Sequence, residues 1–187
     1  GVQFSSFYMP GDFVSHVRMM KTDYEDTGLA QLFGMPFVVL RKPVPFDTTT
    51  LNFNWQVWDT KAFSLYSRST EKIDKKGADM AIAAVCRFLS RMNVLNYNVY
   101  GGYESTVLLE EELVSLRSTA SGLYIPHVKS FDSVERGQIL ADIIDPLTGV
   151  TVAQTEAPED GIVFFAKDSP LVMENETLFK IVNKLHK

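Results

Sequence analysis

The chain of 187 residues is 45% hydrophobic and 22% charged, a composition typical of a globular protein with one core or two small ones. Its formal net charge of −5 argues against nucleic acid and anionic membrane as partners, because both attract a basic surface. No apolar run approaches the roughly 20 residues that span a bilayer. The single cysteine, Cys86, excludes an internal disulfide and suits the cytoplasm, where we expect the protein. The chain starts with Gly1 and shows no signal-peptide pattern, so we expect the cut end of a longer protein.

Strands and helices are expected to alternate through the first half of the chain. Apolar runs and alternating patterns predict strands at 16–19, 37–40, 51–58 and 62–66. Helical spacing predicts one helix over 24–33, capped by Thr22-Asp23 and ended by Gly34, and a second over 77–92 that Asp74 caps. A doubly wound domain needs more than two helices, so residues 1–97 are interpreted as half of an α/β domain.

After a connector at 98–117, residues 118–187 predict a small all-β domain. The segments 122–143 and 161–181 repeat one pattern: a Gly, an apolar strand, a Val, a tight turn and a closing strand. The two turns contain Gly137 and Asn175, residue types that tolerate positive φ. Two such units can pack about a pseudo-twofold axis and close a sheet, which hides its edges.

These segments also carry a family resemblance. The sequences GLYIP at 122–126, VERGQILADIID at 134–145, APEDGIV at 157–163 and PLV at 170–172 resemble the C-terminal β domain of the succinylglutamate desuccinylase/aspartoacylase family. That domain is similar in shape to a biotinyl/lipoyl hammerhead. Upstream, residues 29–39 resemble a helix and strand of the family's zinc-carboxypeptidase-like catalytic domain, and 62–65 with 77–95 resemble its last strand and helix. The implied fold is therefore a partial α/β catalytic domain followed by a small all-β barrel or hammerhead-like domain.

The resemblance implies a zinc hydrolase. Its metal site pairs a His and a Glu three residues apart with a later His, and zinc lowers the pKa of a bound water toward about 7. This chain has no His-x-x-Glu pair, and its only histidines are His16, His127 and His186. His16 is the candidate zinc ligand; the alternative is a histidine hydrogen-bonded at a strand end. Zinc is thus expected in the intact family protein rather than in this chain alone.

The candidate catalytic residues are Tyr66 and Glu71. The family's last strand normally ends in Thr-x-Glu, and the matching place here puts Tyr66 where the Glu stands. Glu71 follows in a polar loop, where a solvated carboxylate is the alternative. Among the arginines, Arg18 and Arg68 are the candidate substrate-binding residues, because a guanidinium binds a substrate carboxylate through paired hydrogen bonds.

Two functions follow from these observations. The first is the C-terminal portion of a zinc-dependent deacylase-like hydrolase that cleaves the amide or ester bond of a small acylated amino acid. The alternative is a non-catalytic fragment or degenerate family member that serves as a ligand-binding or assembly module. A half-domain that exposes apolar surface also predicts a homo-oligomer. The turn at 152–156 has no Lys, which argues against a biotin or lipoate carrier.

Overall fold

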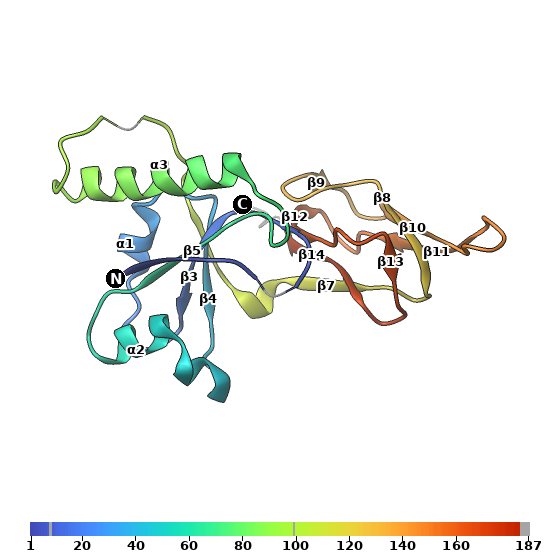
Figure 1. Cartoon of the computed structure of the whole chain (residues 1–187), viewed down its shortest axis with the longest axis horizontal. Helices are drawn as coiled ribbons and strands as arrows, with labels where there is room; N and C mark the ends of the chain where they lie inside the picture. The colour runs from blue at the N-terminus through green and yellow to red at the C-terminus, as the bar shows by residue number, and fades with distance from the viewer. Residues whose placement is uncertain (8, 99, 184–187) are drawn as a thin grey trace. The chain divides into compact units, whose positions relative to one another are not determined.

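The computed structural model describes residues 1–7, 9–98 and 100–183, which form two compact units (Figure 1). The first unit holds residues 1–7 and 15–111, and the second holds the described residues of 8–14 and 112–187. Each unit has its own core of buried apolar side chains. None of the helices in the described ranges is long and apolar enough to cross a membrane.

A five-stranded mixed sheet organises the first unit. Its strand order is β1 (Val2–Ser5), β5 (Phe63–Tyr66), β3 (His16–Met20), β4 (Phe37–Arg41) and β6 (Thr106–Leu109). Strands β3, β4 and β6 run parallel, whereas β1 and β5 run parallel to each other and β5 antiparallel to β3. Every residue of the central strand β3 is buried, including the polar His16 and Arg18, because the strand lies between two neighbours.

The core of the first unit lies between one face of this sheet and two helices, α1 (Thr27–Gln31) and α3 (Lys75–Arg91). Val17, Met19 and Leu65 of the sheet pack with Phe33, which follows α1, and with Ala84 of α3. The first helix is shorter than expected, because Asp26 caps it by accepting the Leu29 N–H at 2.9 Å. The helix ends at Gln31, three residues before Gly34, which has a φ of 63°. Asp74 stands at the expected N-cap position of α3, but its side chain makes no capping hydrogen bond.

The strand expected at 51–58 is wrong. After the 3-10 helix Pro45–Thr49, this segment forms helix α2 (Leu51–Val57), which lies across the strands from α3 (Figure 1). Thr50 caps it by accepting the Phe53 N–H, and the buried positions are Asn52 and Gln56, one helical turn apart. Polar side chains therefore face the sheet and Leu51 and Val57 are exposed, whereas the strict alternation of apolar and polar residues at 51–57 is what resembled a strand.

The second unit contains two antiparallel sheets around a shared core. One sheet has the order β11 (Thr151–Glu156), β10 (Ile139–Ile144), β8 (Gly122–Pro126) and β13 (Leu171–Val172). The other has the order β2 (Asp12–Phe13), β12 (Gly161–Ala166), β14 (Thr177–Asn183) and β7 (Val114–Arg117), with β9 (Ser133–Val134) paired to β12. Among the described residues the strands do not close into a barrel, so the expected barrel is corrected to two open sheets.

The internal repeat predicted from the sequence is confirmed in the strands. Strands β8, β9 and β10 correspond to β12, β13 and β14, and the turns before the closing strands have positive φ at Gly137 (79°) and Asn175 (66°). The short strand of each copy pairs with the first strand of the other copy, β13 with β8 and β9 with β12. This exchange is what an approximate twofold relation between the copies requires.

The expected connector at 98–117 contains strands of both units. Strand β6 completes the first sheet, the 3-10 helix η2 (Glu110–Glu112) follows, and β7 begins the second unit at Val114. The division between the compact units falls between Glu111 and Glu112, and the segment carrying β2 adds to the second unit from a distant part of the sequence.

Candidate functional site

The face of the first sheet opposite its apolar core is polar. Residues opposite each other in neighbouring strands project to the same side, so Gln3, Ser64 and Arg18 share this face, as do Tyr66 and His16. We call these five residues the polar face. Ser64 Oγ accepts hydrogen bonds from Gln3 Nε2 at 2.8 Å and from Asn52 Nδ2 of α2 at 3.0 Å. The inward-facing polar side of α2 thus matches the polar face of the sheet.

Three of the predicted site residues meet on the polar face. His16 lies opposite Tyr66, and their rings stack with centroids 5.3 Å apart and an interplanar angle of 10°. The Arg18 guanidinium carbon lies 5.4 Å from the Tyr66 ring centroid and 5.2 Å from that of Phe7, distances at which cation–π attraction acts. His16 is fully buried, and Phe7 also contacts its ring.

Arg18 is already paired with a carboxylate of the same unit. Its Nη2 donates to Glu110 Oε2 at 2.6 Å, and the Arg41 Nε lies 3.5 Å from the same oxygen and 3.4 Å from Asp47 Oδ2. Glu110 occupies the Nη2 end of the guanidinium, so a substrate carboxylate would have to use the remaining N–H groups of Arg18 or displace Glu110. The binding role expected for Arg18 therefore stays a prediction, and the geometry assigns it an ion pair.

The other two predicted residues, Arg68 and Glu71, lie in the segment between β5 and α3. Arg68 Nε is 3.6 Å from Asp74 Oδ2, and both Arg68 and Glu71 are exposed. Asp74 precedes α3 and fits over Gly77, where a Cβ atom would meet Asp74 Oδ2 at 2.6 Å. The catalytic role of Glu71 and the binding role of Arg68 remain predictions.

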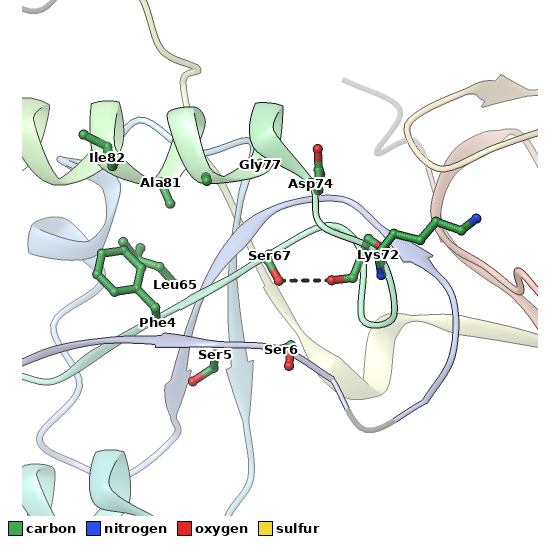
Figure 2. Close-up of a pocket in the computed structure, with 12 residues that line it drawn as sticks. Phe4, Ser5, Ser6, Leu65, Ser67, Lys72, Asp74, Gly77, Ala81 and Ile82 are labelled. Carbon is green, nitrogen blue, oxygen red and sulfur yellow. Dashed lines mark hydrogen bonds between the residues drawn. The ribbon is translucent and has the colours of Figure 1, made fainter.

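A cavity of about 490 Å³ opens where the parallel strands β1 and β5 end and α3 begins (Figure 2). Ligands of open α/β sheets bind outside the carboxyl ends of strands, so its position marks it as a candidate site. Figure 2 shows Phe4 and Leu65 of the strands facing Ala81 and Ile82 of α3, with the polar residues toward the start of the helix. The polar lining consists of Ser5, Ser6, Ser67, Ser69, Lys72 and Asp74.

The pleat of β5 separates this cavity from the polar face. Leu65 lines the cavity, whereas its neighbour Tyr66 turns to the opposite side and stacks on His16. The segment after β5 was expected to be a polar loop, and the cavity beside it was not predicted from the sequence. The sequence did contain a signal, because small hydroxyl residues stand at the end of β1, at Ser5-Ser6, and after β5, at Ser67-x-Ser69.

The described residues do not fit a zinc centre. Over 1–7, 9–98 and 100–183, no group of three or more His, Cys, Asp or Glu side chains could hold a metal ion. His16 is enclosed by the rings of Phe7 and Tyr66. His127 lies in the second unit, and His186 lies outside the described residues.

His127 instead belongs to an exposed hydrogen-bonded row on the second unit. Its Nε2 lies 2.8 Å from Asp142 Oδ2, and Gln154 Nε2 donates to Asp142 Oδ1 at 2.8 Å. The hydrogen bonds from Gln154 and then His127 hold the pKa of Asp142 below its ordinary value. The row ties β10, β11 and the residue that follows β8 together, which gives His127 a structural role.

Comparison with known proteins gives matches only among solved structures. No protein-family model matches the sequence, and no curated protein does. The product-bound ectoine utilization protein EutE (DoeB) of Ruegeria pomeroyi superposes with a TM-score of 0.76 at 14% identity, over 96% of this chain and 56% of its own. A succinylglutamate desuccinylase/aspartoacylase of Rhodobacter sphaeroides gives a TM-score of 0.76 at 15% identity, over 100% of this chain and 58% of its own.

The chain has the fold of the C-terminal portion of the succinylglutamate desuccinylase/aspartoacylase family. A related structure from Shewanella frigidimarina agrees, with a TM-score of 0.73 at 18% identity over 98% of this chain and 53% of its own. The resemblance predicted from the sequence is confirmed at the level of the fold. The chain spans a little over half the length of these desuccinylase/aspartoacylase structures.

Proposed function

We propose that this chain is the C-terminal portion of a deacylase-like hydrolase that acts on the amide or ester bond of a small acylated amino acid. The observation that carries the proposal is the superposition of nearly the whole chain on desuccinylase/aspartoacylase structures. In this proposal the first unit supplies one wall of the substrate site, and the second unit is the appended β domain of the same fold.

The cavity beside β1, β5 and α3 has the chemistry that such a substrate needs. Its apolar side, formed by Phe4, Leu65 and Ile82, suits an acyl chain. Its hydroxyl groups can bond to an amide, and the Lys72 ammonium at the polar end can attract a carboxylate. The fit is to a class of acylated amino acids and does not single out one of them.

Zinc belongs to this proposal only through the family resemblance. The described residues lack the donor set, so a metal ion would have to be held by residues outside them, and no step is derived through it. Neither proposed proton-transfer group lines the cavity, because Tyr66 stacks on His16 at the opposite side of β5 and Glu71 is solvent-exposed. Proton transfer needs a group within hydrogen-bond reach of the reacting atom, so a substrate in the cavity would need that group from elsewhere in the protein.

Hydrolysis assays on the protein as its gene encodes it test the proposal. The protein is stripped with a chelator, reloaded with zinc and assayed for release of free amine from a panel of N-succinyl and N-acetyl amino acids. The proposal expects turnover of at least one panel member. Absence of turnover across the panel, with the protein folded and metal-loaded, would contradict it.

A matched pair of variants tests whether the cavity is the substrate wall. Ala78→Phe fills the cavity from α3, whereas Asp79→Phe places the same ring on the next residue, which does not line it. We expect Ala78→Phe to lower kcat/KM by about tenfold or more, because steric exclusion acts on substrate and transition state alike. Equal losses in both variants would remove the cavity from the proposal.

A non-catalytic ligand-binding module is the second candidate function. It is favoured by the absence of a metal-ligand cluster in the described chain and by Tyr66 at the place where the family carries Glu. Calorimetric binding of an acylated amino acid without turnover, lost in Ala78→Phe and kept in Asp79→Phe, would support this candidate over the first.

A further inference from the structure

Strand β11 leaves one edge of its sheet open. It pairs with β10 on one side, and no strand of the described residues pairs with its other side. Every second residue of such an edge turns its N–H and C=O away from the sheet, which is a template for another strand. An open recess of about 410 Å³ is lined by four consecutive residues of this strand, 151–154.

The β11 edge lacks the charged side chains and prolines that often prevent strand pairing, and its register against β10 shifts between Thr151 and Ala153. Residues 147–155 contain no Lys, Arg, Asp, Glu or Pro. Instead, apolar side chains are exposed beside the edge, with Leu147 94%, Val150 60% and Val152 49% accessible. The other edges of the two sheets in this unit are shorter, since β2 and β13 hold two residues each and β7 holds four and ends in Arg117.

Hydrogen bonds within the chain also order the β11 edge and the turn before it. Asp145 Oδ1 accepts the N–H groups of Leu147 at 2.7 Å and Thr148 at 3.1 Å, which fixes the turn before β11. Gln154 is tied across to Asp142 on β10. Figure 1 shows the β10–β11 hairpin loop standing away from the other strands of the unit. A pre-ordered strand loses little entropy when a second strand adds to it.

We infer that β11 is a dimerisation strand that pairs antiparallel with β11 of a second copy of this chain. In a twofold antiparallel pair, residues near the centre face their own copies, so any charge there would meet a like charge. An uncharged stretch over 147–155 is what self-pairing needs. Centred on Val152 or on Ala153, the pairing places Glu156 opposite Thr148 or Val150 of the second copy, and no like charges meet.

The expected dimer is weak and depends on concentration. One strand pair covers less than the roughly 1,200–2,000 Å² buried in stable interfaces. Exposed apolar residues on the outer face of the sheet, Leu123 and Ile125 among them, would continue across the joined sheets. The inference stands independently of the proposed catalysis, because it concerns the second unit alone.

Sedimentation velocity across a wide range of protein concentration tests the inference. Val152→Lys places two lysines opposite or diagonal to each other at the centre of the pair, and we expect the dimer Kd to rise about tenfold or more. Leu171→Lys makes the same change on β13, at the other edge of the same sheet, and should leave the Kd unchanged. Mixing Val152→Lys with Val152→Glu should restore association, because the opposite charges then meet.

Two results would overturn the inference. If the wild-type chain stays monomeric at all concentrations, self-pairing is ruled out, and a strand from another protein becomes the candidate partner of β11. Equal association of the wild type and Val152→Lys would overturn the inference as well. Hydrogen exchange gives a second measure, since the amides of β11 should exchange more slowly as concentration rises in the wild type and not in Val152→Lys.

Discussion

Arg18 and Glu110 join the central strand of the first sheet to the turn after its edge strand. The two residues are 92 positions apart in the sequence, and Arg18 Nη2 donates to Glu110 Oε2 at 2.6 Å. The side chain of Arg18 is 6% exposed and that of Glu110 is 27% exposed, so the pair is shielded from water on one side. The Glu110 carboxylate therefore offsets the cost of burying the Arg18 guanidinium away from water.

Removing the carboxylate should therefore destabilise the first unit. We expect Glu110→Gln to lower its free energy of unfolding by about 2 kcal/mol, somewhat less than the loss for a fully buried pair, because Arg18 stays buried without a counter-charge. Urea unfolding followed by tryptophan fluorescence measures this, since both tryptophans, Trp55 and Trp58, lie in the first unit.

The neighbouring residue provides the control. Glu111 pairs with Lys42 at 2.8 Å, but both side chains are more than half exposed, and exposed ion pairs contribute between zero and about 1 kcal/mol. Glu111→Gln should shift the urea midpoint far less than Glu110→Gln. Equal shifts would mean that Arg18 relaxes into water when its partner is removed.

The sequence predicted what depends on local pattern. The continuous apolar run at 37–40 became the buried strand β4, and the repeated turn residues marked both copies of the β unit. It failed where tertiary contacts set the conformation. The 51–58 segment alternates like a strand, yet the Thr50 cap and the hydrogen bonds of Asn52 and Gln56 stabilise a helix.

The candidate site shows the same division. His16 and Tyr66 were each noted from the sequence, but their stacking depends on β3 running antiparallel to β5, a register that no local pattern encodes. The partner of Arg18 was not foreseeable, because the acidic run at 110–112 has the composition of a solvated surface. The cavity at the end of β5 likewise needs two strands and a helix to be brought together.

The Gln56 side chain supplies the hydrogen bonds that a neighbouring strand would make at the end of β3. Strand β5 pairs with β3 only as far as Arg18, and beyond it the Gln56 side chain accepts the Met20 N–H at 3.0 Å and donates to the Met20 C=O at 2.9 Å. Gln56→Leu should cost about 1–3 kcal/mol, because the Met20 N–H then loses its partner in a buried place, whereas the Met20 C=O keeps the Thr22 N–H at 3.0 Å.

Val57 is the matched position for Gln56. Its side chain is 40% exposed on the outward side of the same helix, so Val57→Gln should change stability by less than about 0.5 kcal/mol. Tryptophan fluorescence again reports the first unit. If Gln56→Leu were no more damaging than Val57→Gln, the backbone of Met20 would be satisfied by water instead.

The repeat in the second unit predicts equivalent behaviour at its two turns. Gly137 has φ 79° and open space where a side-chain methyl group would stand, so Gly137→Ala should cost about 1 kcal/mol through backbone strain alone. Asn175→Ala should cost a similar amount at φ 66°, and Gly137→Asn and Asn175→Gly should be nearly neutral. Hydrogen exchange of the β10 and β14 amides measures the effect in each copy, and unequal responses would show that the turns are not equivalent.

Lowering the pH should destabilise the second unit, because three of its carboxyl groups have a lowered pKa in the folded state. The Gln154 hydrogen bond lowers the pKa of Asp142, the Leu147 N–H lowers that of Asp145, and Lys167, whose ammonium donates at 2.5 Å, lowers that of Glu176. A carboxyl group whose pKa is lower in the folded state binds protons more readily when unfolded. The stability from these groups is therefore present above the ordinary carboxyl range of about pH 4 and is lost as pH falls through the lower folded-state values.

A variant of Glu176 tests this dependence of stability on pH directly. Because its side chain bonds both Lys167 Nζ and the Met173 N–H, Glu176→Gln should lower stability at neutral pH and flatten the acid limb. Glu174→Gln makes the same change two residues away on an exposed side chain and serves as the control. Hydrogen exchange of the β14 amides from neutral to acidic pH follows the second unit alone. If Glu176→Gln kept the full acid dependence, the Lys167 contact would not be the source of the lowered pKa.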